Sequence, residues 1–211
     1  MTLKLHDKYT VRERLSQFGS AVATRLVPHF QQAGTPFPPK AITLLAFKDS
    51  KQMELYVRGN QHGWHKVRDY PIEGASGGMG PKLCQGDHQV PEGVYTIELL
   101  NPNSQFHVAL RLNYPNGFDQ KMAKNDGRQD LGGDIMIHGK NQSVGCLAMG
   151  DEAAEDLFAL TAWVGKDNVK VVIAPTDFRR NALPVALPSS LPAWVYLLYQ
   201  TLRLELTQYP L

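Results

Sequence analysis

Residues 135–146 read IMIHGKNQSVGC, and this stretch decides both the fold and the candidate chemistry of the chain. Its apolar start leads into His138-Gly139, which is typical of a strand that ends at a turn. A short polar loop follows and closes with Gly145-Cys146. Such a strand end and such a turn would bring an imidazole and a thiol together across the loop. Because a thiol reacts as the thiolate and needs a base within hydrogen-bond reach, we predict a nucleophile at Cys146 and its base at His138.

The loop between the two residues has features that favour catalysis over simple packing. A free cysteine is otherwise most often a small buried hydrophobe. Gly139 and Gly145 bracket the loop and permit close backbone approach with positive φ. Consecutive N–H groups at Gly145 and Cys146 are candidates for donating to an oxyanion. Ser143 would brace the loop or contact substrate, although a serine in a polar loop also commonly forms a turn.

The His-Gly pair, the short loop and the Ser-x-Gly-Cys ending resemble the signature of the YkuD-type L,D-transpeptidase catalytic domain. Residues 70–95 add Tyr-Pro-Ile, Ala-Ser-Gly, Gly-Pro-Lys, Gly-Asp and Pro-Glu-Gly-Val-Tyr, a series similar to the glycine-rich hairpin region of that family. Segments 101–104 (NPNS) and 110–115 (LRLNYP) resemble the YafK-like branch in particular. The resemblance covers roughly residues 40–180, and the combination is specific although each fragment alone is weak.

This resemblance implies an enzyme that acts on peptidoglycan stem peptides through an acyl-enzyme on Cys146. It also implies that the carbonyl of Gly139 holds the second nitrogen of His138 and sets its tautomer. We expect no metal and no cofactor. The expected partners are stem peptides, with a peptidoglycan-linked lipoprotein as a further candidate.

Three residues near the end of a predicted strand are candidates for lining the substrate cleft, although a structural role is equally compatible with their positions. They are Arg111, Asn113 and Tyr114.

Two departures from the family pattern bear on the reaction. Many members carry a second histidine before Gly-Cys and an arginine after it, where this chain has Val144 and Ala148. The missing arginine removes a guanidinium that could grip a carboxylate through two hydrogen bonds. The YafK-like branch shares both departures and includes enzymes that hydrolyse a link between peptidoglycan and an anchored lipoprotein. We therefore expect a hydrolase, an amidase or a lipoprotein-releasing enzyme; the alternative is a true L,D-transpeptidase that forms cross-links or attaches lipoprotein.

Two other classes of function remain open. A metal hydrolase would use Asp134 and His138, which share one face of a predicted strand at positions i and i+4. Catalytic zinc commonly has three protein ligands and an open position, so a third ligand is needed. Its third ligand would be Cys146 or one of the histidines His62, His65 and His88. No tight His-x-x-x-His or Cys-x-x-Cys spacing favours this class. A non-catalytic peptidoglycan-binding module is the other alternative, and the departures at Val144 and Ala148 keep it open.

Composition limits the remaining possibilities. A chain of 211 residues predicts one domain with extensions. The hydrophobic fraction of 43% and the aromatic fraction of 9% are those of a globular protein. A net charge of +2 without a basic stripe argues against nucleic acid as a partner. Two cysteines form no disulfide scaffold. We expect Cys84 to be a packed or half-exposed thiol and Cys146 to be reduced in the active form.

The chain shows no secretory signal. Ala21-Val22-Ala23 resembles a cleavage site, but charged residues precede it where an apolar stretch is needed. The longest apolar run, 193–199, is too short to cross a bilayer, so we expect no transmembrane segment. An enzyme of peptidoglycan works outside the inner membrane. We therefore expect the periplasm or cell envelope, with a leader that was trimmed or omitted from this chain.

Periodicity and turn residues predict the secondary structure. Helices are expected over 11–32, from an N-cap at Asp151 to about 164, and from 192 onward. A stiff linker spans 35–39, and an irregular loop or hairpin spans 74–91. Strands are expected over 41–47, 52–58, 63–70, 94–100, 106–112, 134–138 and 169–174.

These elements predict a mainly β fold of the α+β class. With the resemblance, we expect an L,D-transpeptidase-like β-sandwich core with an N-terminal helix, a helix after the nucleophile and a C-terminal helix. The predicted organisation is a helical extension over 1–34, the catalytic domain over 35–180 and a helical extension over 181–211. The C-terminal helix is expected to pack on the sheet; the alternative is contact with a membrane surface or a partner.

Overall fold

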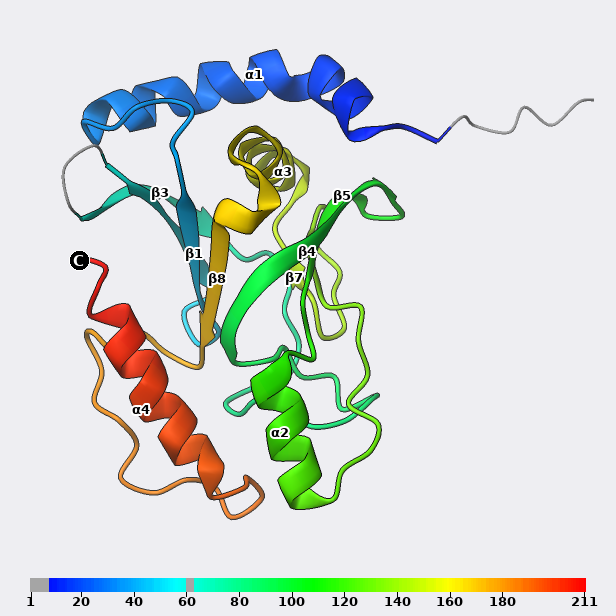
Figure 1. Cartoon of the computed structure of the whole chain (residues 1–211), viewed down its shortest axis with the longest axis vertical. Coiled ribbons are helices and arrows are strands. Elements are labelled where there is room, and N and C mark those ends of the chain that lie inside the picture. Colours follow the sequence, from blue (N-terminus) through cyan, green and yellow to red (C-terminus); the bar gives the residue numbers. More distant parts are fainter. Residues whose placement is uncertain (1–7, 60–62) are drawn as a thin grey trace, which may run out of the picture.

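A computed structural model describes residues 8–59 and 63–211, and in this part of the chain one mixed sheet of eight strands carries four α-helices (Figure 1). The elements are α1 (Val11–Gln32), β1 (Ile42–Phe47), β2 (Gln52–Arg58), β3 (Trp64–Pro71), β4 (Gly93–Ser104), β5 (His107–Leu112), α2 (Gly117–Asp126), β6 (Met136–His138), β7 (Leu147–Ala148), α3 (Asp151–Val164), a short 3₁₀ turn (Lys166–Asn168), β8 (Val169–Ala174) and α4 (Trp194–Leu206). The predicted α+β class is confirmed.

The long strand β4 divides the sheet into two halves. The strand order is β3-β2-β1-β8-β4-β5-β6-β7. Residues 93–96 of β4 pair with β8, and from Ile97 onward β4 pairs with β5. The register shifts between Ile97 and Leu99, where β4 changes partner. The first half consists of β3-β2-β1-β8-β4. The second half consists of β4-β5-β6-β7 and carries the 138–146 loop, which joins β6 to β7.

Both faces of the first half are covered. Side chains alternate along a strand, so Leu44 and Ala46 of β1 join the core under α1 and α3, whereas Leu45 and Phe47 join the core under α4. Figure 1 shows α3 and α4 on opposite sides of β1 and β8. This arrangement explains why β1 is a continuous apolar run rather than an alternating one.

The terminal helices pack as the sequence predicts. α1 starts at a capping box, in which the side chains of Thr10 and Glu13 bond each other's backbone N–H groups. It has the predicted bounds and buries Val22, Leu26 and Phe30. On the opposite side of the sheet, α4 buries five side chains, which confirms its predicted packing. They are Val195, Leu198, Tyr199, Leu202 and Leu206.

Two helices differ from the prediction. The helix α2 was not predicted, although Asn116 and Asp119 form a capping box at its start and Gly127 ends it with φ +72°. The other difference lies at α3. Asp151 is the first helical residue and not the N-cap, which is Gly150. The Asp151 carboxylate accepts a hydrogen bond from the Lys140 backbone N–H at 2.9 Å instead of capping its own helix.

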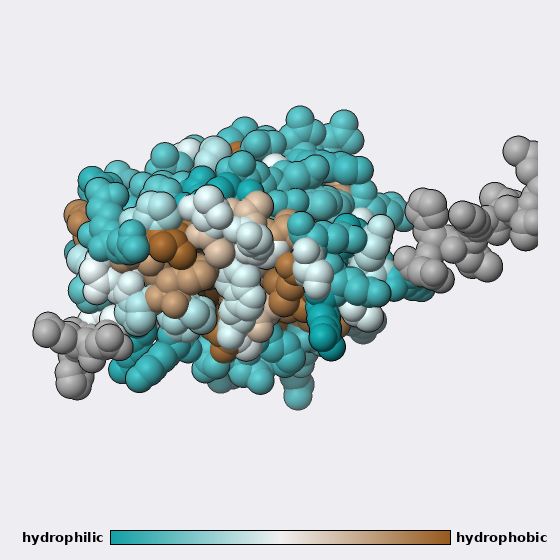
Figure 2. Space-filling model, turned by 90° about the horizontal axis from the view of Figure 1, so that it is seen from above, coloured by the Kyte–Doolittle hydropathy of each residue, from teal (hydrophilic) through white to brown (hydrophobic). Residues whose placement is uncertain are grey.

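The face that carries α1 has an apolar region. Figure 2 shows apolar atoms gathered in the middle of this otherwise largely hydrophilic surface. Beside α1, an open groove of ≈ 510 Å³ includes Val11, Leu15, Leu99 and Leu100 in its wall. Across the described ranges, none of the helices has the length and apolar character needed to cross a membrane.

Candidate active site

The strands β6 and β7 bring the segments of the predicted nucleophile and base side by side. They run parallel, with Ile137 opposite Leu147 and His138 opposite Ala148. His138 is the last residue of β6, and Cys146 immediately precedes β7. The N–H of Met136, two residues before His138, donates to Sγ of Cys146 at 3.4 Å and ties the thiol to the strand that ends at the imidazole. The loop between the two strands is the connection that the sequence predicted.

The two glycines of this loop are required by its geometry. Gly145 has φ +86°, in the left-handed region that side chains disfavour. A Cβ on Gly139 would lie 2.7 Å from the backbone oxygen of Phe106 and 2.5 Å from Oδ1 of Asp151. The chain can therefore turn back after His138 only because position 139 has no side chain.

The thiol of Cys146 is half-buried and held by backbone groups of the preceding strand. Its Sγ accepts a hydrogen bond from the Met136 N–H at 3.4 Å and donates to the carbonyl of Asp134 at 3.6 Å. Burial raises the pKa of this thiol, and the N–H of Met136 and the ammonium of Lys82 offset that rise only in part. The resting group is thus a protonated thiol, which must lose its proton to a base before it can attack.

The surroundings of His138 fix the tautomer of its ring. Its Nδ1 lies 2.6 Å from the carbonyl oxygen of Gly139. A carbonyl only accepts hydrogen bonds, so Nδ1 carries the proton and Nε2 keeps a lone pair. Burial lowers the pKa of His138 despite this hydrogen bond, which keeps the imidazole neutral at neutral pH. The ring is 2% exposed and lies against Phe106, with 4.5 Å between the ring centroids.

Among the hydrogen bonds of the described residues, none joins the thiol to the imidazole directly. The thiol instead points to the carbonyl of Asp134. Catalytic hydrogen bonds are often long or poorly aligned without substrate and tighten when it binds.

Both predicted oxyanion donors are occupied by serine hydroxyls. The N–H of Gly145 donates to Oγ of Ser76 at 2.7 Å, and that hydroxyl donates to the carbonyl of His88 at 2.7 Å. The N–H of Cys146 donates to Oγ of Ser143 at 2.9 Å, and Ser143 donates back to the Cys146 carbonyl at 2.6 Å. Ser143 thus closes a local ring around the nucleophile, whereas Ser76 reaches Gly145 from a distant loop.

A small polar hollow of ≈ 220 Å³ opens beside the thiol. We call it the thiol hollow. Its walls come from the 74–91 loop, from the segment before β6 and from the nucleophile loop: Lys82, Gln85, Gly86, His88, Gly133, Asp134, Ile135, Val144, Gly145 and Cys146. Lys82 is fixed there because its ammonium donates to Asp87 and to the carbonyl of Cys84, each at 2.8 Å.

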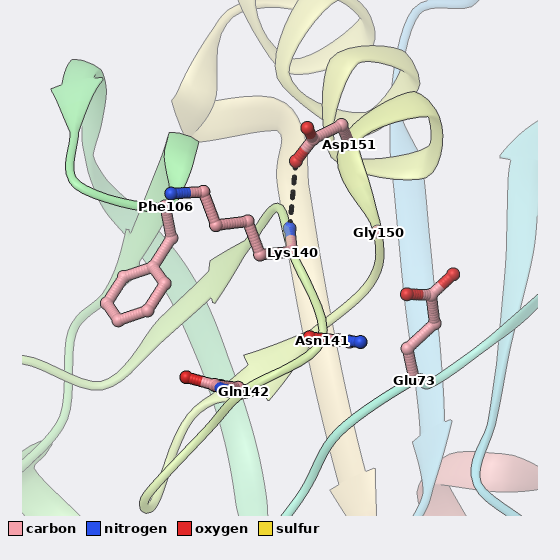
Figure 3. A pocket seen from close by; sticks show the side chains of 7 residues that line it. All are labelled: Glu73, Phe106, Lys140, Asn141, Gln142, Gly150 and Asp151. Carbon is pink, nitrogen blue, oxygen red and sulfur yellow. Dashed lines mark hydrogen bonds between the residues drawn. The ribbon is translucent and has the colours of Figure 1, made fainter.

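A second hollow of ≈ 490 Å³ is lined by other residues of the 138–146 loop, Lys140, Asn141 and Gln142 (Figure 3). Its wall includes Phe106, whose ring also covers His138. Two carboxylates, Glu73 and Asp151, and the ammonium of Lys140 lie around it, together with Asn141, Gln142 and Gly150. This larger hollow does not contain the thiol, so the smaller one is the candidate site of reaction.

The three predicted cleft residues lie outside the walls of the thiol hollow. Two of them contact a wall residue: the guanidinium of Arg111 lies 3.3 Å from the carboxylate of Asp134, and the hydroxyl of Tyr114 donates to the carbonyl of Lys82 at 3.4 Å. The side chain of Asn113 accepts from the Thr96 N–H at 2.9 Å. Tyr114 is buried in the core. The sequence analysis did not single out Lys82 and Ser76, although it identified the 74–91 loop that carries them.

Among the residues that the structure describes, the candidate metal ligands do not gather at one place. The described ranges hold no group of three or more His, Cys, Asp or Glu side chains close enough to bind a metal ion. His62 lies outside those ranges.

Comparisons with known proteins agree with this geometry. Residues 42–173 match the YkuD family, described as the L,D-transpeptidase catalytic domain. The chain is 32% identical over 134 residues to the "Putative L,D-transpeptidase YafK" of Escherichia coli strain K12, with 61% of this chain and 52% of the relative covered. The same values hold for YafK of Escherichia coli O157:H7. The chain thus spans about half the length of the curated relatives it matches.

A solved structure shares the fold. The helical cell shape determining protein Pgp2 from Campylobacter jejuni superposes with a TM-score of 0.51 at 24% identity, covering 64% of this chain and 48% of Pgp2. With the family match over 42–173, the His138 turn and the thiol at Cys146, the conclusion is direct: the chain belongs to the L,D-transpeptidase catalytic-domain family.

Proposed function

We propose that this chain is a cysteine-dependent enzyme of peptidoglycan stem peptides, in which Cys146 forms an acyl-enzyme and His138 is the base. Family membership supports the substrate class. One observation carries the chemistry: the contact between Nδ1 of His138 and the carbonyl of Gly139 leaves Nε2 with a lone pair, at the end of the strand whose Met136 N–H bonds the thiol. A nucleophile without such a base would remain a protonated thiol.

In the acylation step, Nε2 of His138 takes the thiol proton and the sulfur of Cys146 bonds to a stem-peptide carbonyl carbon. The carbonyl oxygen becomes an oxyanion. The N–H of Gly145 would donate to it once the hydroxyl of Ser76 withdraws; losing one such donor in other enzymes costs about 10²–10³ in rate. The carbon–nitrogen bond then breaks, and the leaving amine takes its proton from the imidazolium.

In the second step we propose that water resolves the thioester. Nε2 of His138 takes a proton from water while the oxygen attacks the acyl carbon. The carbon–sulfur bond breaks, and the sulfur of Cys146 recovers a proton from the imidazolium. The products are a free carboxylate and the regenerated thiol, so the enzyme is an amidase or releases a peptidoglycan-linked lipoprotein.

The position two residues after the nucleophile supports water as the acceptor. Ala148 is fully buried, and its N–H and C=O both pair with Gly74, at 2.8 Å and 3.1 Å. Its methyl group does not reach the cleft, and no guanidinium is available at this position to hold a carboxylate of an acceptor peptide. An acceptor that needs no binding site is then favoured.

The alternative is transpeptidation to an amine, which would form cross-links or attach lipoprotein. The second hollow favours it, since the carboxylates of Glu73 and Asp151 would attract an ammonium group. Incubation with purified muropeptides, with and without a lysine peptide derived from the lipoprotein, followed by mass spectrometry, separates the two. Free carboxylate products support hydrolysis and amine adducts support transpeptidation, with the Cys146→Ala variant as the control. Neither product, together with an unlabelled Cys146, would indicate a binding module.

We further propose that the protein acts in the periplasm or cell envelope, because peptidoglycan lies outside the inner membrane. Fractionation of cells, followed by detection of the protein and of the released products, tests this location.

A further inference from the structure

A buried lysine at the end of β1 joins both ends of one segment of the active-site wall. The side chain of Lys48 is 6% exposed. Its ammonium donates to the carbonyl of Gly80 at 2.8 Å and to the carbonyl of Val90 at 2.9 Å. One side chain therefore closes the segment 80–90 into a ring at its base.

A buried carboxylate, Glu92, binds the ammonium of Lys48, and we call these two residues the clamp. Glu92 is fully buried, and its Oε1 accepts from the Lys48 ammonium at 3.0 Å and from the N–H of Gly80 at 2.9 Å. The ammonium of Lys48 and Oε1 of Glu92 thus both bond backbone groups of the segment that they close. Removing one partner of a buried ion pair leaves an uncompensated charge and is strongly destabilising, so the two residues act as a unit.

The clamped segment builds the wall beside the nucleophile. Four of its side chains or backbone groups line the thiol hollow: Lys82, Gln85, Gly86 and His88. The carbonyl of His88 also holds the hydroxyl of Ser76 against the N–H of Gly145. Lys48 and Glu92 are not themselves among the residues that line the hollow. Whatever they contribute to the site must pass through this segment.

The C-terminal segment covers the clamp. Tyr199 of α4 is fully buried, and among the described residues its hydroxyl and Oε2 of Glu92 both lack a hydrogen-bond partner. Burial and the carboxylate of Glu92 raise the pKa of Tyr199. Leu191 packs directly on Gly80, where an added Cβ would lie 2.7 Å from its side chain. Both residues lie outside the region 42–173 that defines the family.

We propose that Lys48 and Glu92 are positioning residues of the active site, which set the wall of the thiol hollow through the segment 80–90, and that α4 is part of this device rather than an accessory extension. The inference rests on the proposed function only in taking Cys146 as the reactive thiol.

The test measures the Cys146 thiol itself and needs no peptidoglycan. In a Cys84→Ser background Cys146 is the single thiol. The rate of its alkylation by iodoacetamide is measured against pH, with hydrogen exchange of residues 74–91, in Lys48→Met and in a matched control, Lys170→Met. Lys170 also binds α4, through Glu205 at 2.8 Å, but it does not contact the segment 80–90.

We expect Lys48→Met to admit water to the thiol hollow. Because burial is what raises the thiol pKa, the alkylation profile should move to lower pH and exchange over 74–91 should accelerate about tenfold, whereas muropeptide turnover should fall about tenfold as the wall loosens. Lys170→Met should leave the profile in place even if it lowers the melting temperature. Lys48→Arg should restore part of the parent profile.

The inference is overturned if Lys48→Met keeps the parent profile, or if Lys48→Met and Lys170→Met move it equally for an equal loss of stability. If Lys48→Met does not fold, Glu92→Gln and Tyr199→Phe take its place, with the same expected direction and the same contradicting result. If the parent protein turns over no muropeptide, the proposed function is contradicted. If Lys48→Met nevertheless shifts the alkylation profile of Cys146, the inference about Lys48 and Glu92 still holds.

Discussion

The hydroxyl oxygen of Ser76 lies 2.7 Å from the backbone nitrogen of Gly145. It occupies the place where the oxygen of a reacting carbonyl would accept the same N–H. If the Gly145 N–H is the oxyanion donor that we propose, the resting site satisfies it with a side chain from the 74–91 loop, and a substrate would have to displace that hydroxyl.

Replacing Ser76 with alanine should raise the acylation rate. A typical intramolecular hydrogen bond contributes about 1 kcal/mol, which corresponds to roughly a fivefold change in rate. Acyl-enzyme formation is measured by rapid-quench mass spectrometry. The control is Ser143→Ala, which should slow acylation because it removes the brace on Cys146. A fall of tenfold or more in Ser76→Ala would instead identify Ser76 as a donor that catalysis needs.

Replacing Cys146 with alanine should abolish turnover and leave the melting temperature nearly unchanged, since the side chain makes only weak contacts with backbone groups. Cys84→Ala should retain most of the activity, because Cys84 is exposed. Turnover of muropeptides and calorimetry of both variants check this. An essential Cys84 beside a dispensable Cys146 would refute the assignment of the nucleophile.

Replacing His138 with glutamine should lower acylation by several orders of magnitude, because the buried thiol is protonated and has lost its base. Nucleophile and base act as one unit, so their losses are not additive. The double variant with Cys146→Ala should be little worse than either single change. Single-turnover kinetics measure this, and near-normal acylation of His138→Gln at neutral pH would remove the imidazole from the mechanism.

Replacing Phe106 with alanine should shift the pH dependence of kcat/KM. His138 must be neutral to accept a proton, and burial holds its pKa below the ordinary value of about 6.5. Removing the Phe106 ring hydrates the imidazole of His138 and raises its pKa. As the pH falls, activity should therefore disappear at a higher pH in the variant than in the parent. The control is Phe106→Leu, whose side chain still covers the imidazole of His138. An acid limb that stays in place would show that the contact has no influence on the base.

The acceptor should be water rather than an amine. A labelled D-amino acid or stem-peptide amine is added during turnover, and its incorporation is compared with the release of free product. We expect release to dominate, because Ala148 offers no group to hold an acceptor carboxylate. Efficient incorporation with negligible hydrolysis would establish ordinary L,D-transpeptidation.

The sequence predicted those elements whose signals are local. The helix α1 has its predicted bounds because Thr10 and Gly34 mark its ends and Val22 and Leu26 repeat at helical spacing. The 138–146 turn was predicted because glycine is needed on both sides of it. The short strand β7 was not predicted, since a pair of residues has no periodicity and forms a strand only because β6 lies beside it.

The contacts that complete the site could not be predicted in the same way. Ser76 and Gly145 are 69 positions apart, and nothing in either local sequence selects the other. The same is true of Lys48, whose partners belong to a loop much later in the chain. Such contacts depend on how the 74–91 loop is laid over the sheet, which is a property of the assembled fold. The roles predicted for Arg111, Asn113 and Tyr114 remain predictions for the same reason.

The strand β4 connects the two halves of the sheet, because it changes its pairing partner from β8 to β5 at Ile97. Residues before Ile97 are tied to β8, and residues after it align β5, which in turn sets β6 and the imidazole at its end. A slip of one residue on one side of this partner change would turn the side chains beyond it to the opposite face. A single inserted residue between Ile97 and Leu99 should therefore misalign the nucleophile and its base, although it lies in neither of their strands.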